Sequence, residues 1–140
     1  MPSKTVEFAV IDTSVYIENF RTGRLTQRIT ESLFLFRGVF VVIHELLRGA
    51  RRSEEHEFAL DLAANLHLYT PTERIWLDSG EIVARLAVAK GYERRKIQEL
   101  SFDVQIALTA RSIGATVITL NSQDFEGTRR YRRFRFICWD

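Results

Sequence analysis

Five polar side chains, spread along the chain, are of the types that hold a hard metal ion. They are Asp12, Glu45, Asp103, Asn121 and Asp124. Carboxylate oxygens, together with an Asn carbonyl oxygen and water, form sites that suit Mg²⁺ or Mn²⁺. Carboxylates gathered at one place repel one another unless a cation neutralises them, and such a cation can orient water and stabilise charge on a phosphate. These residues are therefore candidates for metal-dependent phosphate chemistry, provided that the fold brings them together.

Three mainly apolar runs, rich in β-branched residues, predict buried strands, and each is followed by a candidate residue. The runs are VEFAVI at 6–11, VFVVI at 39–43 and ATVITL at 115–120. VFVVI is too short for a helix of its own and too uniformly apolar for a half-exposed strand. Asp12 follows the first run directly, Glu45 follows the second by two residues, and Asn121 follows the third directly. Because the carboxyl ends of parallel strands lie at one edge of a sheet, we expect these side chains to share that edge.

A helix is expected to bring Asp103 to the same edge. Ser101 is a suitable N-cap, Gly114 a suitable end, and one face between them is apolar. The charged stretch at 92–100 is predicted as a short helix or loop. A helix from Ser101 would run back to the amino end of the strand at 115–120, so its first turn, with Asp103, would lie at the carboxyl edge.

The remaining elements complete an alternation of strands and helices. Between Gly23 and Gly38, one helical face is predicted from the spacing of Leu25, Ile29, Leu33 and Phe36. Further helices are predicted at 44–51, at 54–65 and from Thr72 to Gly91, and short strands at 67–69 and 135–139. With no hairpin turn between consecutive strands, we expect one α/β domain over residues 1–140, a three-layer α/β/α sandwich with a mainly parallel central sheet.

Each acidic position also has a purely structural interpretation. Asp12 can cap the helix that follows it, and Asn121 with Asp124 resembles a capping pair. Glu45 and Asp103 are predicted in first turns, where the helix dipole favours carboxylates. The expected convergence on one edge is what favours a functional site.

Four segments together resemble a PIN domain, and more narrowly the VapC ribonuclease toxins of prokaryotic toxin–antitoxin systems. The segments are VIDTS at 10–14, HELLRGA at 44–50, SFDVQIALTAR at 101–111 and TLNSQDF at 119–125. They occur in the family's order with fitting spacings, and the resemblance covers nearly the whole chain.

The resemblance implies an endoribonuclease that depends on Mg²⁺ or Mn²⁺ and hydrolyses RNA phosphodiester bonds with metal-activated water. Asp12, Glu45 and Asp103 match the family's three most characteristic acids, with Asp12 and Asp103 as the first metal ligands. The fourth acidic position of the family is occupied by Asn121, so that either Asn121 or Asp124, three residues later, takes that role. Ser14 matches a hydroxyl that orients a ligand or water, although it is equally suited to helix capping. The resemblance also implies a homodimer and a cognate antitoxin whose tail enters the acidic groove.

Arginines are the candidates for RNA contact. The segment at 129–135 holds five, interleaved with Tyr131 and Phe134, and such a segment can bind phosphates and stack on unpaired bases. The residues predicted to bind RNA are Arg129, Arg130, Arg132, Arg133, Arg48 and Arg51. A solvated, charge-protected surface is the alternative interpretation.

Composition limits the class of protein. The chain has 140 residues, 46% of them hydrophobic, a formal charge of +2 and one Cys, which argues against a disulfide scaffold or a thiolate zinc site. No apolar stretch approaches the roughly 20 residues of a membrane span, and we expect a cytoplasmic protein. No phosphate-binding loop or dinucleotide fingerprint is present. The alternatives to a toxin are a PIN nuclease of routine RNA processing and a noncatalytic PIN-like RNA-binding module.

Overall fold

The computed structural model describes residues 5–140, which form a five-stranded, entirely parallel sheet in the order β3-β2-β1-β4-β5. The strands are β1 (Phe8–Ile11), β2 (Leu35–Val39), β3 (Leu68–Tyr69), β4 (Thr116–Thr119) and β5 (Phe136–Cys138). The helices of the described chain are α1 (Thr13–Thr22), α2 (Thr26–Thr30), α3 (Phe40–Gly49), α4 (Ser53–Asn65), α5 (Glu73–Lys90), α6 (Arg94–Ser112) and α7 (Ser122–Arg129). The predicted α/β/α fold with a parallel sheet is confirmed.

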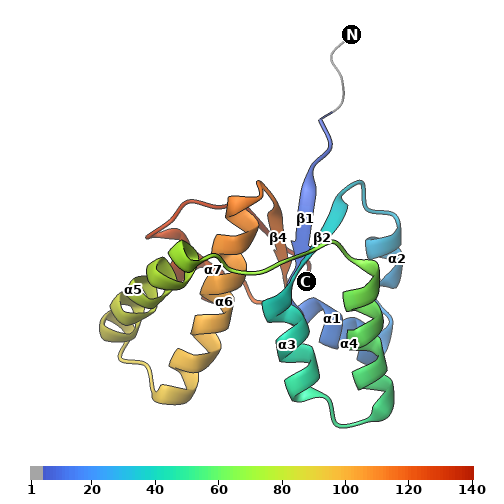
Figure 1. Cartoon of the computed structure of the whole chain (residues 1–140), viewed down its shortest axis with the longest axis horizontal. Helices are drawn as coiled ribbons and strands as arrows, with labels where there is room; N and C mark the ends of the chain where they lie inside the picture. The colour runs from blue at the N-terminus through green and yellow to red at the C-terminus, as the bar shows by residue number, and fades with distance from the viewer. Residues whose placement is uncertain (1–4) are drawn as a thin grey trace.

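The helices form two groups on either side of the strands. Figure 1 shows α1 to α4 on one side of the molecule and α5 to α7 on the other, with β1, β2 and β4 between them. Two helical hairpins, α3 with α4 and α5 with α6, extend beyond the carboxyl ends of the strands. The two hairpins come from different parts of the sequence, and both bring residues to the carboxyl edge of the sheet.

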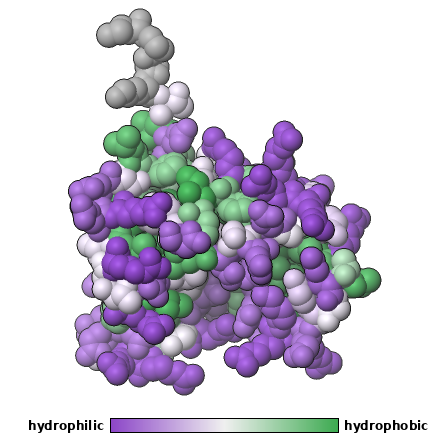
Figure 2. Space-filling view, turned by 180° about the vertical axis from the view of Figure 1, so that it is seen from behind, coloured by the Kyte–Doolittle hydropathy of each residue, from purple (hydrophilic) through white to green (hydrophobic). Residues whose placement is uncertain are grey.

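The central strands are held by complete burial of their apolar side chains. Val10 in β1 and Val117 and Ile118 in β4 have no exposed surface, and β1 pairs with β4 from Ala9 to Ile11. A strand covered on both faces needs such a continuous apolar run, which is why these two strands were predictable. Figure 2 shows the outcome at the surface, where hydrophilic side chains dominate one whole face around smaller apolar areas.

The second predicted strand is wrong in its position. β2 is Leu35–Val39. The other four residues of the predicted strand, 40–43, form the first turn of α3, with Val41, Val42 and Ile43 buried. A short, uniformly apolar run fits a buried helix as well as a buried strand. The helical face predicted between Gly23 and Gly38 shrinks to α2, since Leu33 is 99% exposed and Phe36 lies in β2.

The prediction that a helix starts at Ser101 is also wrong. α6 begins at Arg94 and includes most of the charged stretch at 92–100. The Ser101 hydroxyl donates to the Ile97 carbonyl oxygen at 2.9 Å, so that Ser101 is an interior residue and not a cap. Charged residues on the solvent side of a helix produce no apolar periodicity, and nothing in this stretch breaks the helix. By contrast, the predicted start of α5 at Thr72 is confirmed, because the Thr72 hydroxyl accepts from the Ile75 N–H at 3.2 Å.

Phe125 anchors α7, and we predict that Phe125→Ala is strongly destabilising. Its side chain is fully buried, with ring centroids 6.2 Å from Phe134 and 6.3 Å from Phe136. Removing a buried Phe side chain costs about 3–5 kcal/mol of unfolding free energy. Urea unfolding of Phe125→Ala and of the exposed control Leu33→Ala checks this, the control being expected within about 0.5 kcal/mol of wild type. Equal losses in both variants would show that α7 does not depend on this contact.

Candidate functional site

Asp12 lies at the carboxyl end of β1, held by two hydroxyl groups. Its Oδ2 accepts from Ser14 Oγ at 2.8 Å and from Thr119 Oγ1 at 2.9 Å. Only 4% of the residue is exposed. Burial raises the pKa of Asp12, and the hydrogen bonds from Ser14 and Thr119 oppose that rise. The carboxylate is therefore held by Ser14 in the first turn of α1 and by Thr119, the last residue of the neighbouring strand β4.

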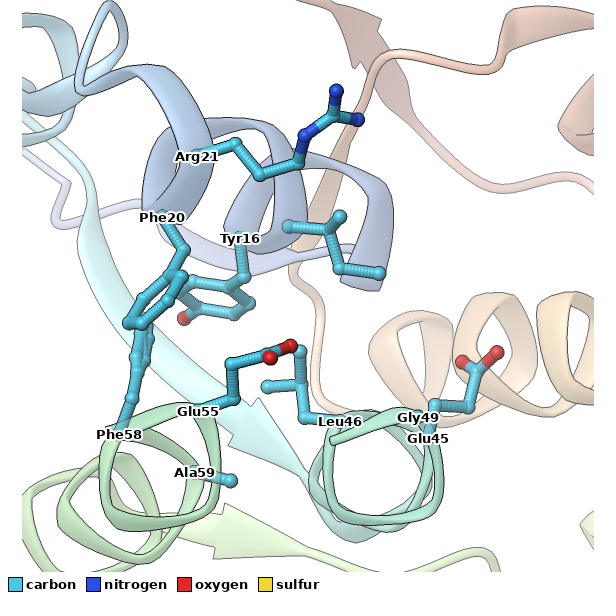
Figure 3. Close-up of a pocket in the computed structure, with 10 residues that line it drawn as sticks. Tyr16, Phe20, Arg21, Glu45, Leu46, Gly49, Glu55, Phe58 and Ala59 are labelled. Atoms are coloured by element: carbon cyan, nitrogen blue, oxygen red, sulfur yellow. The ribbon is translucent and has the colours of Figure 1, made fainter. Parts of the chain in front are cut away.

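Glu45 reaches the same region from the second turn of α3. Its Oε1 accepts from Thr13 Oγ1 at 2.7 Å. Burial raises the pKa of Glu45 to about 7, the Thr13 hydrogen bond opposes the rise, and the charge of Asp12 adds to it. Figure 3 shows the Glu45 carboxylate turned away from Tyr16 and Phe58. Because α3 starts earlier than predicted, Glu45 is not in a first turn, and the helix dipole does not account for it.

Asp103 projects from the middle of α6 into a region of negative charge. Burial raises the pKa of Asp103 to about 9, with further rises from Asp12, Asp124 and Glu45 and an opposing contribution from Lys96. Within residues 5–140, no hydrogen bond or ion pair joins the Asp103 side chain to a partner. The helix-start interpretation of Asp103 is therefore wrong, but the predicted convergence with the other acids agrees with these charge interactions.

Asp124, in the first turn of α7, is bound on both oxygens. Asn121 Nδ2 donates to Asp124 Oδ2 at 2.6 Å, and Lys96 Nζ lies 2.9 Å from Asp124 Oδ1. Asn121 occupies the N-cap position of α7, but its side chain makes no capping bond to the backbone. The pair is thus linked side chain to side chain, which leaves the Asn121 carbonyl oxygen available and gives Asp124 its own cation.

The acidic residues fit a hydrated divalent cation better than a closed protein cage. In the described part of the chain, no three His, Cys, Asp or Glu side chains already enclose a point that a metal ion could fill. Mg²⁺ usually keeps several waters and takes one or two carboxylates directly. Within residues 5–140, Asp124 forms an ion pair with Lys96, whereas Asp12, Glu45 and Asp103 form none. Asp12 and Asp103 can therefore serve as direct ligands, with Asp124 and the Thr13-bonded Glu45 acting through water.

The predicted RNA-binding arginines divide into two groups by position. Near the acids, the Arg48 guanidinium lies 4.9 Å from the centroid of Phe102, the residue before Asp103, and Arg51 is exposed in the loop after α3. Arg130 lines a cavity with Lys96 and Asp124.

The other arginines of the 129–135 segment make contacts within the protein. Arg129 covers the ring of Phe136, and Arg132 lies 3.7 Å from Asp78. The Arg133 carbonyl accepts from Arg111, and Arg135 donates to the carbonyl of Gly114, just before β4. Arg133 and Arg135 therefore lie toward the amino edge of the sheet, away from the acids.

Sequence reasoning missed the supporting hydroxyls of Thr13 and Thr119. Thr119 is fully buried, donates to Asp12 and accepts from the Asn121 N–H at 2.9 Å. A polar residue that ends an otherwise apolar strand beside a candidate acid is the signal that would have found it. Lys96, in the charged stretch at 92–100, is the ion-pair partner of Asp124, which no local pattern indicates.

An apolar pocket lies between α1, α3 and α4, and it borders the acidic site because Glu45 is one of its lining residues. It encloses about 150 Å³, and Tyr16, Phe20 and Phe58 form its aromatic wall, with ring centroids 5.9 Å apart for Tyr16–Phe58 and 5.4 Å for Phe20–Phe58. Figure 3 shows Arg21 and Glu55 at its polar rim.

No helix within residues 5–140 is long and apolar enough to cross a bilayer.

The raised pKa values of Glu45 and Asp103 predict that the metal-free protein loses stability as the pH rises. Carboxyl groups of an unfolded chain titrate near pH 4, whereas the pKa values of Glu45 and Asp103 are raised to about 7 and about 9. Over this interval the unfolded state binds fewer protons, so that the free energy of unfolding should fall from about pH 4 to about pH 9. Asp103→Asn should flatten much of the fall in urea unfolding with EDTA. A wild-type profile as flat as that of the variant would contradict the buried-charge account.

The hydroxyl of Thr119 predicts a second effect on stability. Thr119→Val keeps the side-chain shape but leaves the Asn121 N–H and one Asp12 contact unmatched, which should cost about 1–3 kcal/mol. Thr116→Val is the matched control, because Thr116 is buried in the same strand and its side chain bonds to none of the acids. Urea unfolding compares the two, and equal costs would remove the special role of Thr119.

Comparisons with known proteins agree with this architecture. The family model described as PIN domain matches residues 9–130. Among solved structures, VapBC-1 from nontypeable Haemophilus influenzae gives a TM-score of 0.67 at 20% identity, covering 94% of this chain and 98% of that one. DNA-bound VapBC from Salmonella typhimurium gives a TM-score of 0.67 at 22% identity, covering 97% of this chain and 100% of that one. VapBC-5 from Mycobacterium tuberculosis gives a TM-score of 0.59 at 21% identity, covering 94% of this chain and 98% of that one.

At these identities, the solved structures establish a shared fold. No curated protein matches the chain. The family match spans most of the chain, including all five acidic or amide residues singled out above. The chain belongs to the PIN domain family.

Proposed function

We propose that this protein is a divalent-metal-dependent endoribonuclease and acts as the toxin of a type II toxin–antitoxin pair. The observation that carries the proposal is the approach of Asp12, Glu45, Asp103 and Asp124, from four separate segments, to one edge of the sheet. The charge of Lys96 opposes theirs at Asp103. Such an unbalanced group of carboxylates supports binding of Mg²⁺ or Mn²⁺.

The chain's own residues divide the work of the proposed reaction. Asp12 and Asp103 would hold the cation, which when bound supplies activation of water and neutralises charge on the phosphate. Ser14 and Thr119 keep Asp12 in one orientation through their hydrogen bonds. Glu45, with its raised pKa, can exchange a proton near neutral pH.

The arginines beside the acids supply the proposed contacts to RNA. Arg48 lies over the ring of Phe102, and the His44 ring lies 5.7 Å from the same ring at a tilt of 47°, so that a cation and two aromatic rings form a surface next to Asp103. Such surfaces bind phosphates and stack on unpaired bases. The exposed Arg51 and Arg130, which lines the cavity beside Asp124, are the further candidates for phosphate contact. Contacts by Arg129, Arg132 and Arg133 stay part of the prediction.

The first test is cleavage of single-stranded RNA with and without metal. We expect cleavage in Mg²⁺ or Mn²⁺, none in excess chelator, and a loss of at least about 100-fold in Asp12→Asn or Asp103→Asn, because metal ligands matter at least as much as their supporting residues. Asp61→Asn, an exposed change in α4, should keep full activity. Circular dichroism checks that the variants fold. Cleavage that persists in chelator, with contaminating nuclease excluded, would refute the mechanism.

The proposed partner is a small antitoxin encoded beside this chain. The solved relatives include a toxin–antitoxin complex from Klebsiella pneumoniae and several VapBC proteins. In this chain, the apolar pocket at Tyr16, Phe20 and Phe58 offers a seat for apolar side chains, and the acids nearby attract a basic one. Insertion of that basic group would compete with the cation. The homodimer implied by the family resemblance stays a prediction.

We predict that the antitoxin encoded beside this chain suppresses RNA cleavage, and that the Phe20→Lys variant is no longer suppressed. A charge placed in the pocket should weaken binding by about tenfold or more, as expected for a central aromatic contact. Leu60→Lys is the matched control, since Leu60 and Phe20 are both 47% exposed but Leu60 lies outside the pocket. Calorimetric titration measures both affinities. Absence of an inhibitory neighbour, with harmless overexpression of an active enzyme, would favour an RNA-processing nuclease.

A further inference from the structure

A second cavity borders Asp124 and is lined by basic side chains. It encloses about 520 Å³ between the end of α5, the start of α6 and the length of α7. Lys90, Lys96 and Arg130 line it, and Tyr92 contributes the aromatic ring. From Gln123 to Arg130, its wall follows about 10 Å of chain at the helical rise of α7. The cavity is therefore an elongated hollow that begins at the acidic site.

Its charges leave positive groups free for a ligand. Lys96 is already paired with Asp124 at 2.9 Å, and its Nζ also lies 5.8 Å from the centroid of Tyr92. Lys90 and Arg130 are exposed, and Glu126 is the other acid on the lining. The hollow thus combines excess cationic charge with an aromatic face.

We propose that this cavity binds the nucleotide of single-stranded RNA that flanks the cleaved bond. The inference rests on the proposed nuclease function and adds the place where the substrate extends from the acids. Lys90 and Arg130 contact its phosphates, Lys96 lies between the phosphates and Asp124, and Tyr92 stacks on its base. The volume falls within the roughly 300–1,000 Å³ typical of ligand pockets, and phosphates with an unpaired base match cations beside an aromatic ring.

Binding of a short fluorescein-labelled oligouridylate tests the proposal. The full chain carries Asp103→Asn throughout, so that the RNA is not cut, and fluorescence anisotropy is measured over a range of salt concentrations. The paired change Lys90→Gln and Arg130→Gln should make the salt dependence shallower by about 0.7 for each lost phosphate contact. Lys96 is left unchanged, because its removal would also free Asp124.

Two further variants separate stacking from charge. Tyr92→Leu should weaken binding about tenfold with an unchanged salt slope, whereas Tyr92→Phe should bind as the parent does. The paired change Arg24→Gln and Arg28→Gln removes the same charge from exposed residues around α2, which neither line this cavity nor belong to the arginines predicted to bind RNA, and should leave the slope unchanged. Thermal unfolding checks that each variant is folded.

The outcomes distinguish this inference from the function on which it rests. If the wild type cleaves RNA but the Lys90/Arg130 and Tyr92→Leu variants bind like the parent, the cavity is not an RNA subsite. If these variants keep RNA binding and lose only the antitoxin, the cavity belongs to the protein partner, and the proposal is overturned. If the wild type neither binds nor cleaves RNA, the proposed function fails and this inference fails with it.

Discussion

The repulsion among four carboxylates, held close together in a partly buried edge of the sheet, is the constraint on which the site depends. Desolvation raises the pKa of Asp12, Glu45 and Asp103, and each of the latter two is raised further by neighbouring acids. A fold that only needed capped helices would gain nothing from this arrangement. The unfavourable charge has a chemical use when a cation and a phosphate enter together.

The architecture supplies rigid support for that arrangement. Adjacent strands β1 and β4 place Asp12 and Thr119 within hydrogen-bond distance, and the fully buried Phe125 holds α7 and hence Asp124. Glu45 and Asp103 come from the two helical hairpins that extend past the carboxyl ends of the strands (Figure 1). Groups held on packed helices and strands are already in position, so that no free energy is needed to reorganise them at the moment of reaction.

Sequence reasoning succeeded where one physical requirement determines the pattern. Strands β1 and β4 must be apolar on both faces, so Asp12 and Asn121 were placed correctly at their ends. Asp103 was expected at the same edge through a helix start at Ser101 that does not exist, since α6 begins about two turns earlier. The outcome agreed because the direction of that helix, and not its first residue, sets the edge.

The failures have equally physical causes. The run at 39–43 can be buried either as a strand or as a helix. Residues 35–39 form the strand that pairs with β1 and β3, and this long-range pairing leaves the residues after Val39 to form the helix. Arginines at 129–135 are neighbours in sequence, but the chain turns back between α7 and β5 and separates Arg130 from Arg135. The hydroxyl of Thr119 and the ion pair of Lys96 with Asp124 depend on contacts across more than 25 residues, which no local pattern contains.

The most direct measurement is a crystal structure of the full chain with Mn²⁺, located by its anomalous scattering. We predict an ion at bonding distance from both Asp12 and Asp103, completed by water, with Glu45 and Asp124 in its outer shell. Mn²⁺ bound only at other residues, or no density at these two carboxylates under saturating Mn²⁺, would contradict the account.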